Sequence, residues 1–191
     1  MVEIKMRKVI YSMLVSLDGF IEGPNRELDW THVDEESMSL FNDQQRGMDT
    51  LLYGRRLYEV MTYWETAEAD PSISEVEREF ARIWKNSTKL VFSKTLEQVQ
   101  GNARLVRGDI AGEITKLKQQ PGKDLEIGGP NLASTVMQLG LIDEYRLVVH
   151  PVVLGSGTRF FPALADKIDL RLVETRAFGS GVVYLRYLTI S

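Results

Sequence analysis

A strand, a glycine pair, a helix and a second strand follow one another with short connections in LEIGGPNLASTVMQLGLIDEYRLVVHPVV, residues 125–153. The first strand ends at Gly128, Pro130 suits the first turn of a helix, and Gly140 suits its end. Between them, apolar residues recur at the spacing of one helix face: Leu132, Val136 and Leu139. Because strands joined through a helix lie parallel, this unit predicts an α/β fold with a largely parallel sheet.

The glycine pair Gly128-Gly129 has two interpretations. In the first, bare backbone N–H groups lie at the positive end of the following helix, where an anion such as a phosphate can approach closely. In the second, the glycines only make a tight turn. The residues of this stretch leave both interpretations open.

Strand and helix patterns alternate along the rest of the chain, with no internal repeat, low-complexity segment or linker. The patterns predict strands at 9–16, 50–53, 89–93, near 105 and at 145–153, and helices at 35–47, 55–63, 74–85 and 110–119. Two alternating runs around Gly179-Ser180-Gly181 predict a C-terminal antiparallel hairpin. We therefore expect a single domain over residues 1–191.

Composition narrows the functional classes. The net charge of −4 gives no electrostatic footprint for nucleic acid or an anionic membrane, so we expect neither partner. The absence of cysteine excludes thiolate nucleophiles, disulfides and thiolate metal sites. Apolar stretches fall short of the roughly 20 residues that a membrane helix needs, and polar residues interrupt the N-terminal apolar run. We expect a cytoplasmic protein.

Four expected strands end in glycine, hydroxyl or cationic residues. These ends are Gly54-Arg55-Arg56, Ser93-Lys94-Thr95, Gly128-Gly129-Pro130 and Gly155-Ser156-Gly157. Ligands of open α/β sheets lie outside the carboxyl ends of the strands, and these residue types suit a phosphate-bearing ligand. The sequence thus favours a nucleotide site, although the G-x-G-x-x-G fingerprint and the P-loop are both absent.

Few residues suit acid, base or metal chemistry. The only histidines, His32 and His150, lack metal-ligand spacing, so we expect structural roles for them and no metal. No nucleophile-elbow motif occurs. A redox reaction in which a cofactor supplies the reactivity accounts for this scarcity.

Several motifs in this order resemble the dihydrofolate reductase superfamily: MLVSLDGFIEG, LLYGRRLYE, LVFSKTL and IGGPNLASTVMQLGLIDEYRLVVHPVVLGSGTRFF. The resemblance covers residues 7–190 and is strongest to the C-terminal reductase domain of the bifunctional riboflavin-biosynthesis deaminase-reductase and its stand-alone relatives. It implies a three-layer α/β fold with a mixed, mostly parallel sheet, helices on both faces and a C-terminal antiparallel hairpin.

The resemblance also implies a function. It suggests a homodimeric, NADPH-dependent reductase that transfers hydride to a C=N or C=O group of a small heterocycle, such as a ribosylaminopyrimidine of the riboflavin pathway. The fold alone leaves two other possibilities. One is a nucleotide-binding or sensing module without turnover. The other is an interaction or structural protein with an emptied site, against which the intact Gly54-Arg55 and Gly128-Gly129 pairs argue.

Roles for individual residues follow from the same resemblance. Ser93 and Lys94 are expected to flank the adenosine 2′-phosphate of NADPH, and Asp18, beside the nicotinamide, or water is expected to supply the proton. The remaining cofactor-binding residues are Gly19, Phe20, Gly54, Arg55, Gly128, Gly129, Pro130, Asn131 and Leu132. The aromatic residues Trp30, Phe41 and Trp64 are candidates to frame a flat substrate. The alternatives are a bare turn at Asp18-Gly19 and core packing for the aromatic residues.

The first helix departs from the dihydrofolate reductase pattern. Those enzymes carry a pterin-binding carboxylate on this helix, at an offset from the GR pair that here falls on Met38. The nearest acids are Glu35, Glu36 and Asp43, and the first two are explained by their position in the first helical turn. We therefore expect a poor dihydrofolate reductase.

Overall fold

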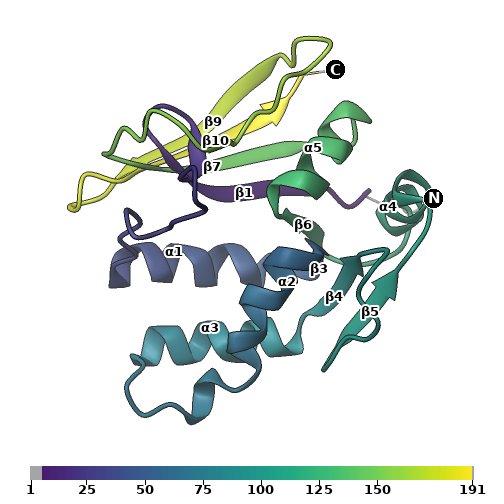
Figure 1. Cartoon of the computed structure of the whole chain (residues 1–191), viewed down its shortest axis with the longest axis horizontal. Helices are drawn as coiled ribbons and strands as arrows, with labels where there is room; N and C mark the ends of the chain where they lie inside the picture. The colour runs from purple at the N-terminus through teal and green to yellow at the C-terminus, as the bar shows by residue number, and fades with distance from the viewer. Residues whose placement is uncertain (1–5, 191) are drawn as a thin grey trace.

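An eight-stranded sheet forms the centre of the computed structural model, which describes residues 6–190 (Figure 1). The strand order is β5-β4-β3-β6-β1-β7-β10-β9. The strands are β1 (Val9–Ser16), β3 (Met48–Gly54), β4 (Thr88–Phe92), β5 (Ala103–Val106), β6 (Asp124–Gly128), β7 (Glu144–His150), β9 (Leu170–Ala177) and β10 (Val183–Thr189). The six strands from β5 to β7 are parallel, and the hairpin β9–β10 adds two antiparallel pairings. A mixed, mostly parallel sheet with a C-terminal hairpin is therefore confirmed.

Helices cover both faces of this sheet, which gives the expected three layers (Figure 1). One face carries α1 (Glu35–Arg46), α2 (Arg55–Met61) and α3 (Glu75–Asn86), and the other carries α4 (Ile110–Lys118) and α5 (Pro130–Gln138). Alternate residues of each central strand face the two helix layers. In β3, Leu52 packs with the α4 and α5 cluster, whereas Leu51 and Tyr53 pack with α3.

Polar caps fix where the helices begin. The Asp34 carboxylate accepts from the Ser37 N–H at the start of α1, and Ser74 forms a capping box with Glu77 at the start of α3. The helix predicted for 55–63 is α-helical only to Met61 and continues as a 3-10 helix, Thr62–Glu65. The strand predicted to reach residue 153 ends at His150, because the Pro151 that follows has no N–H for the ladder.

A short antiparallel pair outside the main sheet joins two distant segments. Strand β2 (Phe20–Glu22) pairs with β8 (Thr158–Arg159). This pair brings Glu22 towards the carboxyl ends of the central strands. Within residues 6–190, no helix combines the length and the apolar character that a membrane span requires.

Candidate functional site

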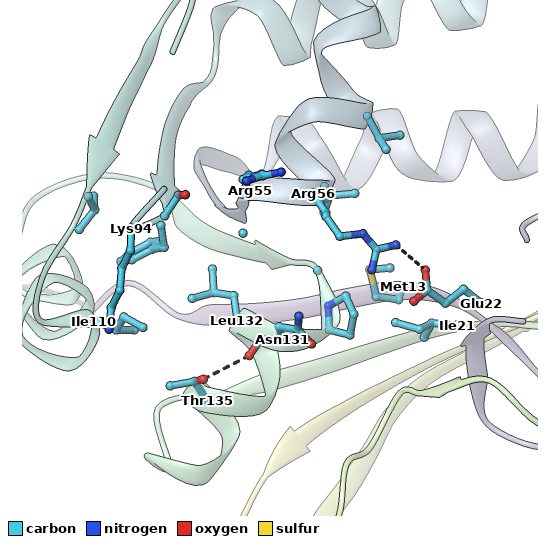
Figure 2. Close-up of a pocket in the computed structure, with 18 of the residues that line it drawn as sticks. Met13, Ile21, Glu22, Arg55, Arg56, Lys94, Ile110, Asn131, Leu132 and Thr135 are labelled. Carbon is cyan, nitrogen blue, oxygen red and sulfur yellow. Dashed lines mark hydrogen bonds and ion pairs between the residues drawn. The ribbon is translucent and has the colours of Figure 1, made fainter. Parts of the chain in front are cut away.

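A cavity of about 610 Å³ opens at the carboxyl ends of β3, β4 and β6 (Figure 2). It gathers residues that the sequence placed at a cofactor site: Gly54, Arg55, Ser93, Lys94, Gly129, Pro130, Asn131 and Leu132. In Figure 2, Arg55 and Arg56 of α2 lie across the cavity from Asn131 and Leu132 of α5. Its volume falls in the range of about 300–1,000 Å³ typical of small-molecule sites.

The glycine pair between β6 and α5 serves two distinct steric needs. Gly128 lies against the Leu57 side chain of α2, and a Cβ at position 128 would overlap it. Gly129 has φ +92°, a conformation that a side chain disfavours, and it lines the cavity. The glycines therefore do make a tight turn. The same turn also exposes backbone without side chains to the cavity, directly before the N-terminus of α5.

Cationic residues gather where β4 and β5 end. Lys94 and Arg107 line the cavity there, and Lys94 and Ile110 lie at the opposite end of the view from Met13 and Glu22 (Figure 2). The Arg107 guanidinium donates to the backbone carbonyls of Lys94, at 3.0 Å, and Leu96, at 2.6 Å. Arg107 thus fixes the loop that carries Lys94, and this end of the cavity suits an anionic group.

The Arg55 side chain is already partnered within the chain. Its guanidinium pairs with Glu59 at 3.0 Å and donates to the Thr95 hydroxyl at 3.0 Å. Arg56 pairs with Glu22 at 3.1 Å, and Thr158 donates to the other Glu22 oxygen at 2.7 Å. These contacts join α2 to the loop after β4 and to the β2–β8 pair, so they hold the cavity wall in place.

A second, smaller cavity of about 180 Å³ lies against the α1 side of the sheet. It shares the lining residues Met13 and Leu57 with the large cavity, and Gly128 lines it next to Gly129 of the other. The other lining residues are Ser12, Leu14, Phe41, Gln44, Gln45, Tyr53, Met61, Phe80 and Glu126. The two cavities therefore adjoin at Met13, Leu57 and the glycine pair.

Glu126 is the acidic residue in the wall of the small cavity. It lies on the central strand β6, surrounded by protein, with part of its surface open to the cavity. Loss of solvation raises the pKa of its carboxyl to about 7, although the Gln45 hydrogen bond and the charge of Arg146 both favour ionisation. A carboxyl of this kind changes protonation near neutral pH, which is typical of functional sites.

Asp18 lies outside the lining of both cavities. Its carboxylate accepts from the Ser16 hydroxyl at 2.7 Å and from the N–H groups of Leu154 and Gly155 at 3.1 and 2.7 Å. The Ser16 hydrogen bond, followed by those from the backbone, lowers the pKa of Asp18 to about 2. A carboxylate that is ionised at neutral pH holds no proton to donate, so this geometry favours a structural role.

The other expected residues around Asp18 also lie away from the cavities. Gly19 has φ +89° and its carbonyl accepts from the Phe160 N–H at 2.9 Å. Phe20 is buried, with the Arg159 guanidinium 4.9 Å from its ring centre. Neither residue lines either cavity.

Of the three aromatic candidates, only Phe41 lines a cavity, the small one. Trp30 lies edge-on to His150 with ring centres 5.5 Å apart, and its indole N–H donates to the Glu27 carbonyl. Trp64 packs against Phe80, with ring centres 4.7 Å apart. Met38 of α1 packs against the same aromatic cluster, so it offers no contact to either cavity.

A sequence model of the RibD C-terminal domain family matches residues 7–184. The chain belongs to the RibD C-terminal domain family. Among relatives in this family, the uncharacterised protein YyaP of Bacillus subtilis (strain 168) is 40% identical over 185 residues, covering 96% of each chain. The family that the motifs predicted is thus confirmed.

Solved structures agree with this RibD C-terminal fold. A candidate riboflavin biosynthesis protein from Shewanella sp. PV-4 superimposes with a TM-score of 0.73 at 22% identity, over 97% of this chain and 100% of that one. Dihydrofolate reductase from Enterococcus faecalis, solved with NADP(H), gives a TM-score of 0.63 at 14% identity, over 96% and 97% of the two chains. At these identities the likeness establishes the dihydrofolate reductase-like fold.

Among the cavity residues that were not predicted from the sequence are three charged ones: Glu22, Arg107 and Glu126. Glu22 and Arg107 reach the site through the β2–β8 pair and the loop after β5, which are tertiary features without a local pattern. Glu126 did leave a signal, because a charged residue inside the apolar run LEIGG is unusual for a strand buried on both faces.

Proposed function

We propose that the protein is an NADPH-dependent reductase of a small heterocyclic substrate. The observation that carries this proposal is the large cavity at the strand ends, with bare backbone at Gly129, the α5 N-terminus and a cationic end at Lys94. NADPH, when bound there, supplies the hydride that reduces a C=N or C=O group. The NADP(H) in the Enterococcus enzyme of the same fold supports this choice of cofactor.

The residues present fit a dinucleotide phosphate. A Cβ at position 129 would lie 3.5 Å from Leu57, on a backbone conformation that side chains disfavour. The glycine therefore leaves this part of the cavity open to a phosphate. Lys94, in the loop held by Arg107, offers a cation to the 2′-phosphate at one end. Met13 and Leu57 line both the large cavity and the small cavity. The small cavity therefore adjoins the cofactor cavity, and we assign the substrate ring to it.

The chain's own contribution is to orient two ligands and to exclude water between them. The ion pair of Arg56 with Glu22 and the contacts of Arg55 with Glu59 and Thr95 hold α2 over the cavity. Most of the exposed wall of the small cavity is apolar, so the faces of a flat ring placed there contact apolar side chains.

The test has two arms. Calorimetric titration of the full chain with NADPH measures binding, and loss of nicotinamide absorbance across a panel of aminopyrimidines, pyrimidinones and dihydrofolate measures turnover. We expect saturable NADPH binding, with consumption for a pyrimidine and little for dihydrofolate. Binding without consumption of any substrate indicates a sensing module instead, and the absence of NADPH binding refutes the proposal.

A further inference from the structure

The interior of the sheet holds an acidic residue that the fold itself does not require. Along β6, Leu125 and Ile127 pack into the apolar cluster under α4 and α5, whereas Glu126 faces α1. Strand β6 is hydrogen-bonded to β3 on one side and β1 on the other, so this carboxyl lies in the middle of the molecule. Burying a carboxyl there costs free energy unless its charge is matched.

The described residues give the Glu126 carboxyl few hydrogen-bond donors and no cation of its own. Gln45 of α1 donates one hydrogen bond to it, and Arg146 of β7, whose charge favours the ionised carboxyl, is engaged at 2.7 Å with Glu144. Tyr53 of β3 lines the same cavity, but its hydroxyl, which accepts from Trp84, makes no hydrogen bond to Glu126. Within residues 6–190, Glu126 therefore has one donor and no ion pair, whereas a carboxylate accepts up to four hydrogen bonds.

Two glutamine amides beside Glu126 are also incompletely satisfied. Gln44 and Gln45 are both more than nine-tenths buried and line the small cavity. The Nε2 of Gln44 and the Oε1 of Gln45 have no partner among the described residues. Buried polar atoms without partners are rare in native proteins, and each calls for an explanation. Here they cluster with an unmatched carboxyl at one cavity, which indicates a polar ligand.

We infer that Glu126 is the residue that determines substrate specificity, and that it binds a pyrimidine-type ring through an amidine edge, a ring nitrogen next to an amino group. This inference rests on the proposed function, because it names the substrate class of the same site. The cavity of about 180 Å³ is smaller than a whole-ligand site and suits one ring. Its apolar walls, among them Leu14, Phe41 and Phe80, suit the faces of that ring.

The amidine edge follows from charge and geometry. Two parallel N–H donors match the two oxygens of a carboxylate, which is the strongest arrangement available to it. A carboxylic acid and a neutral amidine together carry one proton that can move between them, so the pair buries no net charge. The α1 helix supplies no competing carboxylate, since Phe41, Gln44 and Gln45 are its residues in the lining of the small cavity.

The experiment uses 2,4-diaminopyrimidine as the probe and uracil, which lacks amino groups, as the matched ring. Each is titrated calorimetrically into the full chain with and without NADPH, for wild type, Glu126→Gln and Glu113→Gln. Glu113 is a matched control because it lies on α4, paired with Arg104, away from both cavities. We expect wild type and Glu113→Gln to prefer 2,4-diaminopyrimidine at least about tenfold, and Glu126→Gln to lose that preference.

A folded Glu126→Gln protein that keeps the preference overturns the inference, as does a wild type that binds uracil equally well or binds neither ring. If NADPH binds and the pyrimidine does not, this inference alone fails. If the pyrimidine binds through Glu126 and NADPH does not, the proposed cofactor fails and this inference stands.

A second measurement covers the case in which Glu126→Gln does not fold. In wild type labelled at glutamate carboxyl carbons, the titration of Glu126 is followed by NMR. Because an amidine favours the ionised carboxyl, 2,4-diaminopyrimidine should lower the pKa of Glu126 by at least about one pH unit. A carboxyl with a purely structural role would titrate unchanged.

Discussion

Removal of the Glu126 carboxyl should change how stability depends on pH. Burial raises the pKa of this group to about 7 from an ordinary 4.5. Between these values the folded state holds a proton that the unfolded state has released. The free energy of unfolding therefore falls as pH rises through this window. At about 1.36 kcal/mol for each pH unit, the loss amounts to about 3 kcal/mol at most, because water in the adjoining cavity screens part of the charge.

The assay is urea unfolding of wild type, Glu126→Gln and Glu126→Leu at pH 4.5, 6 and 8. Neither variant titrates at this position, so each should gain up to about 3 kcal/mol relative to wild type between the lowest and highest pH. His150, whose pKa burial lowers, adds a pH dependence of its own, but it contributes equally to all three proteins. The two variants should therefore differ from each other by a constant. Parallel curves for wild type and both variants would show that Glu126 carries an ordinary pKa.

Three further predictions concern the large cavity and Asp18. Lys94→Ala should weaken NADPH about tenfold to a hundredfold and leave NADH unchanged in calorimetry, because it removes a charge-assisted contact to the 2′-phosphate. Lys116→Ala on α4 is its control, and equal losses for both cofactors would contradict the assignment. Gly129→Ala should lose about 1–2 kcal/mol of stability and also NADPH affinity, whereas Gly140→Ala, with φ +64° and no cavity contact, should lose stability alone in melting and titration experiments. Asp18→Asn should lower the melting temperature, because Asp18 accepts from the Leu154 and Gly155 N–H groups, and should leave the pH profile of turnover unchanged. Since the pKa of Asp18 is lowered to about 2, its stabilisation is present above pH 4 and is lost as pH falls towards 2, so the gap in melting temperature between the two proteins should narrow there.

Local patterns predicted the layers of this fold because their physical causes are local. The strand 9–16 and the starts of the helices at 35, 55 and 110 were predicted correctly, since alternation, caps and glycines act within a few residues. Three of the four phosphate-type strand ends line the large cavity, because parallel strands present their carboxyl ends at one edge of a sheet. The fourth, Gly155-Ser156-Gly157, lines neither cavity.

The site's chemistry was predicted less completely, because it depends on which residues meet across the sheet. Glu126 differs from a surface glutamate only through Gln45, which is 81 residues distant in sequence. Asp18 resembled a nicotinamide neighbour in its motif, yet its partners come from residues 154 and 155. Single-sequence patterns carry no information about such pairings.

The position of β6 between β3 and β1 has a consequence for synthesis of the protein. The Lys8 N–H donates to the Asp124 side chain at 2.8 Å, a contact between residues 116 positions apart. During synthesis, β1 and β3 emerge from the ribosome before β6, the strand that lies between them. Until β6 has emerged, the edges of β1 and β3 that pair with it have no hydrogen-bond partner. Contacts of such long range slow folding and expose nascent strands to aggregation. Translation speed and chaperone supply should therefore influence the yield of soluble protein.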